Sequence, residues 1–312
     1  GVVPLGPDLD FNRPHNRDAL SDASRRVAGG GMSMSKRRKL HAVIDAQDSA
    51  DGDGVKIRRI AGRHVNAQLD PFLLLDEIRA DDSADYAGGF PAHPHRGFET
   101  ITYMLEGAFR HRDHLGNEGV ISSGGVQWMT AGRGVIHCEM PEQSDGRMHG
   151  FQLWLNLPAA EKMKPAAWQE IGSEQIPTID LPDGGRVKVI AGAVEHAGDT
   201  VKGPVAQGST RPTYLDVELA PNASWRLAVD PEHSVLVLVF QGASTALVEG
   251  QMGVYHAGDT LNLEASGGGM RALVLGGRPL REPIAQYGPF VMNTIEEVEA
   301  ALRDYRAGRL VA

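Results

Sequence analysis

The chain has 312 residues, enough for one large or two ordinary domains, and its hydrophobic content of 41% fits a globular protein with a substantial core. The net charge is −9 and no long basic stripe is present, which disfavours direct nucleic-acid binding. A single cysteine, Cys138, excludes an internal disulfide, and no apolar run is long enough for a membrane span or a secretory leader, so we expect a cytoplasmic protein.

Residues 1–38 are polar and rich in Asp, Arg, Asn, Ser and Gly. This composition predicts a disordered or loosely attached extension. The basic run Lys36–Lys39 lies at its end. We interpret that run as a solvated, charged terminal stretch, with a localisation signal or a phosphate contact as the alternatives.

Short apolar segments bounded by turn residues follow along most of the chain. This spacing is typical of an all-β barrel or sandwich, and the layout suggests an internal duplication. The first series comprises Leu40–Ile44, Val55–Ile60, Phe72–Ile78, Thr100–Glu106, Gly119–Ile121, Val126–Thr130 and Met148–Asn156. The second comprises Val187–Ala191, Thr213–Leu219, Ala223–Val229, Ser234–Gln241, Ser244–Val248, Thr260–Leu263 and Met270–Gly276. The run Ser266–Gly269 predicts a turn between the last two strands.

One helix is predicted near the end of the chain. Thr294 and Glu297 have the spacing of a capping box, and Gly308 is placed as the C-terminal cap. One apolar face, which we expect to pack on the outside of a barrel, is formed by Ile295, Val298, Leu302 and Tyr305.

Two pairs of metal-binding side chains stand out. His93 and His95 are two residues apart, and so are His137 and Glu139. Residues i and i+2 of a strand point to the same face, so each pair can converge on one point. Three imidazoles and a carboxylate suit iron, manganese, nickel, copper, cobalt or zinc. Cys138 lies between two of these residues, and we expect it on the opposite face as a small core residue.

The acidic ligand is open between two residues. Glu99 is an even number of positions after His95 and would share its face in an ideal strand. Glu139 is favoured because it lies beside His137, which leaves Glu99 as a hydrogen-bonding group near the site. His111 and His114 are three apart, so we interpret them as part of a solvated turn, whereas His149 is a candidate to face the cavity. Pocket-lining candidates, for each of which core packing is the simpler role, are Phe98, Trp128 and Met129.

The amino-acid sequence around these pairs resembles that of the pirin family of the cupin superfamily. The similarity is carried by Pro91–Gly107, Gly124–Pro141 and Tyr287–Thr294. It implies two tandem, jelly-roll-like cupin β-barrels followed by a C-terminal helix, with metal in the first barrel only. The implied layout is an extension at 1–38, a metal-binding barrel at 39–165, a metal-free barrel at 166–290, and the helical segment 291–312. The implied metal ligands are His93, His95, His137 and Glu139.

The resemblance also implies an activity. It indicates a quercetin 2,3-dioxygenase type of enzyme, which opens the ring of a flavonol or a similar aromatic enol with O2. The expected cofactor is one divalent metal, Fe(II) first, and Glu139 is the expected catalytic base. The alternative is a redox-responsive regulatory module that acts on transcription through a protein partner. A sugar isomerase or epimerase that uses Arg96 and Arg133 for phosphate is a further, weaker interpretation.

Overall fold

The structure is a computed structural model that describes residues 35–62, 67–205 and 208–312. Most of the predicted extension at 1–38 lies outside the described residues. The fold belongs to the compact unit Lys36–Ala312. None of the helices in the described ranges is long and apolar enough to cross a membrane.

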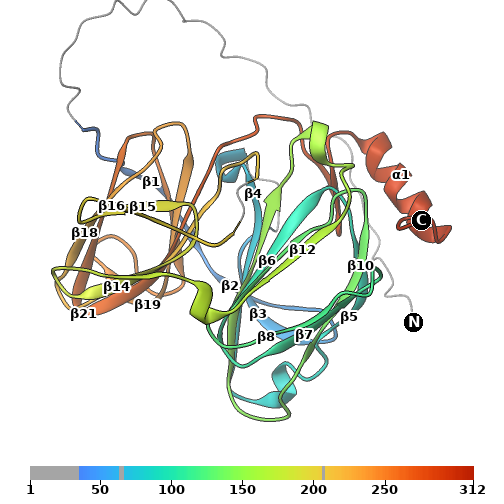
Figure 1. Ribbon diagram of the computed structural model, residues 1–312, viewed down its shortest axis with the longest axis horizontal. Coiled ribbons are helices and arrows are strands. Elements are labelled where there is room, and N and C mark those ends of the chain that lie inside the picture. Colours follow the sequence, from blue (N-terminus) through green and yellow to red (C-terminus); the bar gives the residue numbers. More distant parts are fainter. Residues whose placement is uncertain (1–34, 63–66, 206–207) are drawn as a thin grey trace, which may run out of the picture. The chain divides into compact units, whose positions relative to one another are not determined.

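Two antiparallel sheets make up the first half of this unit, drawn in blue to green in Figure 1. A seven-stranded sheet has the order β12-β9-β6-β11-β4-β3-β2, and a four-stranded sheet has the order β5-β10-β7-β8. The strands are β2 (Gln47–Asp51), β3 (Val55–Ala61), β4 (Phe72–Ala80), β5 (Phe90–His95), β6 (Phe98–Glu106), β7 (Phe109–Asp113), β8 (Glu118–Ile121), β9 (Val126–Thr130), β10 (Val135–Pro141), β11 (Met148–Asn156) and β12 (Ala167–Ile171).

The second half is built on an eight-stranded sheet, with order β1-β20-β19-β21-β17-β14-β13 and β18 paired to β21. Its strands, with those of two small hairpins, are β1 (Leu40–Asp45), β13 (Thr178–Asp180), β14 (Gly185–Ala191), β15 (Ala193–His196), β16 (Asp199–Lys202), β17 (Thr213–Leu219), β18 (Ser224–Ala228), β19 (Ser234–Ser244), β20 (Gln251–Tyr255), β21 (Thr260–Gly277), β22 (Ala285–Tyr287) and β23 (Phe290–Met292). The 3-10 turns are Ala67–Leu69, Ser83–Asp85, Ala159–Glu161 and Ser173–Gln175, and α1 is Ile295–Arg306. The predicted all-β fold with a C-terminal helix is confirmed.

Two strands near the predicted domain boundaries join the other half. β1 precedes the first half in sequence but pairs with β20, and Figure 1 draws it among the strands of the second half. β12 begins at Ala167 and pairs with β9 of the first half. The boundaries at 39, 165 and 290 stay a prediction.

The central strands of the seven-stranded sheet are buried on both faces. Its strands β6 and β11 consist almost entirely of buried residues. One face lines the interior of the first barrel, and the other packs against the second half, where Tyr103, Phe151, Leu238 and Phe240 belong to one apolar cluster. Both strands therefore carry polar as well as apolar residues at buried positions, such as Thr100 and Thr102 of β6.

The glycine run Ser266–Gly269 is not the turn that we predicted. It lies inside the single strand β21. Residues 260–264 of that strand pair with β18, and residues 270–277 pair with β17 and β19. Cβ atoms at Gly267 and Gly268 would meet almost nothing, and Gly269 has a φ of 77°. Glycine therefore lets one strand bend from one set of partners to another.

The C-terminal segment packs next to the metal-ligand candidates of β5. The capping box of α1 is confirmed, since Thr294 Oγ1 accepts from Glu297 N–H and Glu297 accepts from Thr294 N–H. Gly308 follows the helix at φ 66°. Of the predicted apolar face, Val298 is buried, but Ile295 is 45% exposed and was wrongly included. Ile295 is the first residue of the helix, at an end that neighbouring elements do not cover.

Two buried cations hold this segment to the first barrel. Arg96 forms an ion pair with Asp304 of α1 at 2.9 Å and also donates to the Arg133 carbonyl oxygen. Lys162 donates to Gly97 O at 2.7 Å, Asn156 Oδ1 at 2.7 Å and Val291 O at 2.9 Å. Because Arg96 is buried and paired, it is poorly placed to bind a sugar phosphate.

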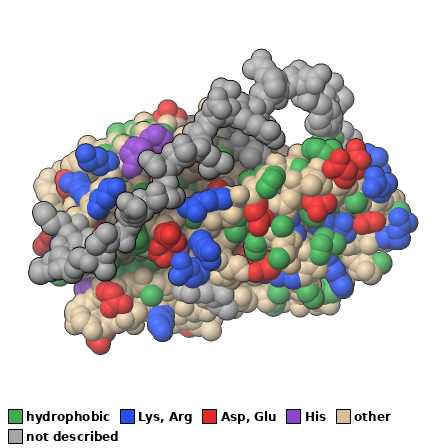
Figure 2. Space-filling model, turned by 90° about the horizontal axis from the view of Figure 1, so that it is seen from above, with side chains coloured by type: hydrophobic (Ala, Val, Ile, Leu, Met, Phe, Trp, Pro, Cys, Tyr) green, Lys and Arg blue, Asp and Glu red, His purple; other side chains and the backbone are tan. Residues whose placement is uncertain are grey.

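The basic run at the start of the described chain also differs from expectation. Arg38 is only 2% exposed, and it donates to the backbone oxygens of His256 and Asp230. Its neighbours Lys36, Arg37 and Lys39 are exposed as predicted. Figure 2 shows that basic and acidic side chains are interspersed on one face of the molecule. The run is therefore partly structural, because one of its arginines anchors the segment before β1 to the second half.

Candidate metal centre

Three neighbouring strands of the four-stranded sheet each supply two residues to the site. These are His93 and His95 of β5, His137 and Glu139 of β10, and His111 and Asp113 of β7. β10 lies between β5 and β7, and its His137 is directly opposite His93 of β5. Glu139 of β10 is opposite His111 of β7. A bulge between His137 and Glu139 interrupts the pairing to β5. Because alternate residues share a face, the pairs from all three strands project into the first barrel.

The histidine side chains converge closely. One ligand atom from each of His93, His95 and His137 lies within 4.8 Å of the others, and the same holds for His111, His137 and Glu139. His137 belongs to both groups, so the two groups form one continuous cluster. The imidazole rings of His93 and His137 are 4.4 Å apart, and those of His95 and His137 are 4.9 Å apart.

Several of the ring nitrogens have no protein partner. His95 Nδ1 and His137 Nε2 are buried and form no hydrogen bond within the described part of the chain. His93 Nδ1 lies 2.8 Å from Pro91 O, which leaves its Nε2 available. Buried polar atoms normally have partners. A cluster of convergent nitrogens without partners is what a first-row metal ion would satisfy.

Burial disfavours the charged form of His95, His111 and His137. It holds the pKa of His95 well below the usual value, with a further contribution from His93. Burial, followed by the neighbouring His93, His95 and His111, does the same to the pKa of His137. Burial also lowers the pKa of His111, against the opposing effect of Glu139 and Asp113. Neutral imidazole is the form that ligates metals.

The two acidic candidates occupy different surroundings. Glu139 is 2% exposed, and its two carboxylate oxygens accept from Thr102 Oγ1 at 3.0 Å and Gln152 Nε2 at 2.9 Å. Glu99 accepts from Thr130 Oγ1 at 2.7 Å and lies in neither metal-ligand group of the described residues. Glu139 is thus the carboxylate that the fold places beside the histidines.

His111 is the site residue that sequence reasoning missed. We interpreted it as part of a solvated turn, but it is fully buried, and its Nδ1 lies 3.3 Å from His137 Nδ1. Its Nε2 is 3.7 Å from Asp113 Oδ2, and its ring stacks on Trp168 at 5.8 Å. The signal was present, because His111 and Asp113 have the same i, i+2 spacing as the other pairs. We overlooked this spacing because we compared His111 with His114 and not with Asp113.

Other expectations near the site have mixed outcomes. The ring of Phe98 packs against the imidazole of His95, with 5.1 Å between the ring centroids. Trp128 instead belongs to the apolar cluster shared with the second half. His149 points away from the metal-ligand candidates and contacts Glu77 and Phe240, so its expected place in the cavity was wrong. Cys138 is half-buried on the outer face of β10 and is not a core residue.

The second half offers no comparable cluster among the residues that the structure describes. The core between its strands is apolar and includes Val187, Val217, Val237, Leu261 and Val274. The first barrel instead has Thr100, Thr102, Gln127 and Glu139 at buried positions. The two halves share an architecture, but among the described residues the metal-ligand groups are confined to the interior of the first.

Known proteins with similar sequences cover nearly the whole chain. A Vibrio cholerae protein named "Putative quercetin 2,3-dioxygenase" is 45% identical over 279 residues, covering 88% of this chain and 98% of that protein. Human pirin is 39% identical over 283 residues, covering 88% of this chain and 94% of pirin. A crystal structure of quercetin 2,3-dioxygenase from Acinetobacter baumannii is 35% identical with a TM-score of 0.81, covering 88% of this chain and 99% of that one.

Two family descriptions match the two halves. The description "Pirin" matches residues 54–155, which contain every metal-ligand candidate. The description "Pirin C-terminal cupin domain" matches residues 214–311. These matches agree with two cupin domains, of which the first contains the histidine cluster. The chain belongs to the pirin family.

Proposed function

We propose that this chain is a metal-dependent dioxygenase of the quercetin 2,3-dioxygenase type, acting on a flavonol or a similar aromatic enol with O2. The observation that carries the proposal is the convergence of His93, His95 and His137 within 4.8 Å. The names of two similar proteins, one from Vibrio cholerae and one from Acinetobacter baumannii, supply the substrate class. The protein is proposed to act in the cytoplasm.

The donor set fits one divalent metal ion. His93, His95 and His137 would hold it through imidazole nitrogens, and Glu139 would supply the carboxylate. This mixture of nitrogen and oxygen donors suits Fe(II), our first choice, and also manganese, nickel, copper, cobalt or zinc. When bound, such an ion supplies a Lewis acid that lowers the pKa of an enol hydroxyl group.

The protein side chains would then position and move the proton. Glu139 is the candidate catalytic base, because it is the carboxylate that shares a metal-ligand group with His137. Thr102 and Gln152 each donate to one of its oxygens, which fixes the plane of the carboxylate. Fixed donors of this kind hold a base in its reactive orientation. His93 is the least buried of the three histidines, so the substrate would approach from its side.

Metal analysis and oxygen uptake test the proposal together. Protein purified without chelator or nickel resin should hold about one equivalent of metal, and His137→Ala should lose most of it. His196→Ala is the matched control, since that histidine lies in β15 and outside both ligand groups. Quercetin-dependent oxygen consumption should follow the metal content. Absence of turnover with every metal tested would reject the dioxygenase and leave the metal site standing.

A pair of amide variants decides which carboxylate is the ligand. Glu139→Gln should lower metal affinity about 10- to 100-fold and abolish turnover, because the amide is a poorer ligand and no base. Glu99→Gln should retain the metal, because Glu99 bonds to Thr130 instead. Calorimetric titration with the metal measures both. Loss of metal in Glu99→Gln alone would reverse the assignment.

A further inference from the structure

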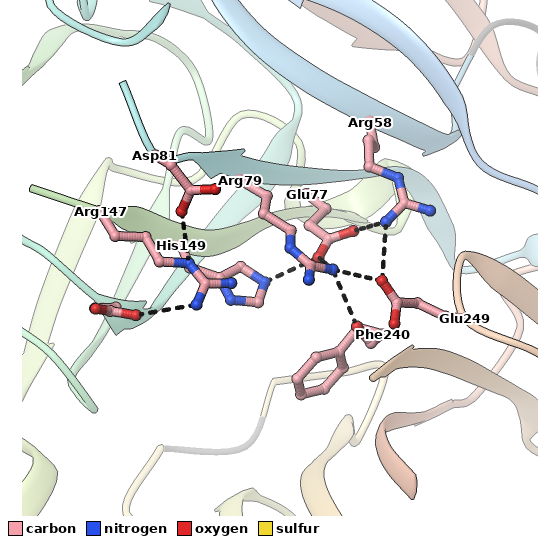
Figure 3. Close-up of polar contacts among 9 residues, drawn as sticks. Arg58, Glu77, Arg79, Asp81, Arg147, His149, Phe240 and Glu249 are labelled. Carbon is pink, nitrogen blue, oxygen red and sulfur yellow. Dashed lines mark hydrogen bonds and ion pairs between the residues drawn. The ribbon is translucent and has the colours of Figure 1, made fainter. Parts of the chain in front are cut away.

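A polar cavity lies between the two halves of the unit, and none of its lining residues belongs to the histidine cluster. Its volume is about 230 Å³. Residues of both halves line it. The first half contributes Arg79, Leu105, Glu106, Arg147 and His149, and the second contributes Phe240, Gln241 and Arg271. Figure 3 shows Arg79, Arg147 and His149 gathered beside Phe240. Three arginines from two barrels therefore converge on one small space.

Two buried acids that contact the lining residues, Glu77 and Asp216, already have partners. Glu77 is fully buried, accepts from Arg58 at 3.2 Å, and lies 2.8 Å from His149 Nε2 (Figure 3). Asp216 accepts two bonds from Arg271, at 2.9 and 2.6 Å, and one from the Tyr103 hydroxyl at 2.6 Å. Arg58, which does not line the cavity, compensates the charge of Glu77, and Arg271 compensates the charge of Asp216.

Arg147 and Arg271, in contrast, retain donors. Arg147 Nε is buried and makes no hydrogen bond to a described residue, although it lies 3.4 Å from Asp81 Oδ1. Arg147 Nη1 lies 3.7 Å from Glu106 Oε2, and the side chains of Asp81 and Glu106 are 89% and 54% exposed. Such long, solvent-screened pairs contribute little. Arg271 uses Nε and Nη2 on Asp216, and its Nη1 has no hydrogen bond among the described residues.

We propose that this cavity binds the phosphate or carboxylate group of a small anionic ligand. Arginine presents several fixed N–H donors and is the preferred partner of such oxyanions. An incoming oxyanion would replace the weak contacts of Arg147 with Asp81 and Glu106, and would bridge the two halves through Arg79, Arg147 and Arg271. Glu249, which accepts from Arg79 at 2.6 Å and is 41% exposed, would stay beside it.

The cavity also shares a strand with the metal centre. His149 of β11 faces the cavity, and Gln152 on the opposite face of the same strand donates to Glu139. A ligand between the halves would thus contact the reverse side of a strand that supports the candidate base. The binding proposal itself is independent of the proposed dioxygenase activity.

Calorimetric titration with inorganic phosphate, and separately with succinate, tests the proposal on the purified chain. We expect saturable binding of at least one of them, weakened at least about ten-fold in both Arg147→Gln and Arg79→Gln, since each loses a charged donor. Arg303→Gln is the matched control: Arg303 is 64% exposed on α1 and makes one ion pair of 3.7 Å, so binding should be unchanged. The stronger of the two probes identifies the chemical group.

Two further measurements keep the outcome decisive. His137→Ala should retain binding, which separates this cavity from phosphate held at the metal centre. Melting curves without ligand verify that Arg147→Gln and Arg79→Gln are folded. Absence of saturable binding with both probes, undiminished binding in both arginine variants, or loss of binding in His137→Ala would each overturn the proposal. The arginines would then serve only the ion-pair network between the halves.

Discussion

At the scale of single residues, spacing identified which side chains share a face, but not which strands lie together. His93 and His95 belong to one strand and His137 and Glu139 to another, and the structure places these strands side by side. His111 was not predicted as a site residue, because that prediction requires knowing that a third strand, β7, lies beside β10. The role of Lys162 could not be predicted at all, because a single lysine in a loop gives no sign of burial. In the structure its ammonium group donates to three separate segments.

Lys162 should make a large contribution to stability. Its replacement in Lys162→Met leaves the buried oxygens of Gly97 and Val291 without this donor, whereas Asn156 Oδ1 keeps the Leu157 N–H. Each of the two carbonyl oxygens costs about 1–3 kcal/mol, so we expect a loss of about 2 kcal/mol or more. Urea unfolding measures it, with the exposed Lys202→Met as control. A loss no larger than that of the control would contradict the role assigned to Lys162.

The same lysine predicts a dependence on pH. Burial lowers the pKa of Lys162 from 10.5 to about 8, against the opposing effect of Glu282 and Glu297. Between these two values the unfolded chain binds more protons than the folded one, so the lysine's contribution to stability rises with pH. The difference in unfolding free energy between wild type and Lys162→Met should therefore widen from pH 8 to pH 10. A constant difference would show that the folded pKa is not lowered.

At the scale of elements, short sequence patterns predicted the structure correctly where it depends on residues close together in the chain. The capping box of α1 is a short-range pattern, and it is present as predicted. The glycine run in β21 was misread because glycine permits a turn but does not impose one. Pairing to β18 before the run and to β17 and β19 after it keeps the segment extended. Those partners are distant in sequence.

The cap of α1 gives a prediction at this scale. Thr294→Ala removes the acceptor for the Glu297 N–H and should destabilise the protein by about 1 kcal/mol. Thermal unfolding compared with Thr245→Ala, an exposed threonine outside any helix, measures the effect. Equal melting temperatures for the two variants would show that the cap contributes nothing.

At the scale of the whole unit, the two halves share a buried interface. An apolar cluster contains residues of both, and the Tyr103 hydroxyl of the first half donates to Asp216 of the second at 2.6 Å. Asp216 is 3% exposed, so the Arg271 guanidinium neutralises a buried charge between the halves and the Tyr103 hydroxyl adds a hydrogen bond to it. The pKa of Tyr103 is raised by burial first and then by Asp216.

Two matched tyrosines test this interface. Tyr103→Phe removes a hydrogen bond to a buried carboxylate and should cost about 1.5–3 kcal/mol. Tyr214 is the control, because its hydroxyl is equally buried but has no hydrogen-bond partner in the described chain. Tyr214→Phe should therefore be neutral or stabilising. Denaturant unfolding compares the two, and a larger loss in Tyr214→Phe would contradict the interpretation.

The sequence by itself determined the all-β class, the terminal helix and two of the residue pairs at the candidate metal centre. These features depend on periods of two and 3.6 residues, which are local properties of the chain. The tertiary structure decided which strands are neighbours, and with that the inclusion of His111, the burial of Lys162 and Arg38, and the arginine-lined cavity between the halves. Each of those depends on residues far apart in sequence, whose approach only the packing of the sheets determines.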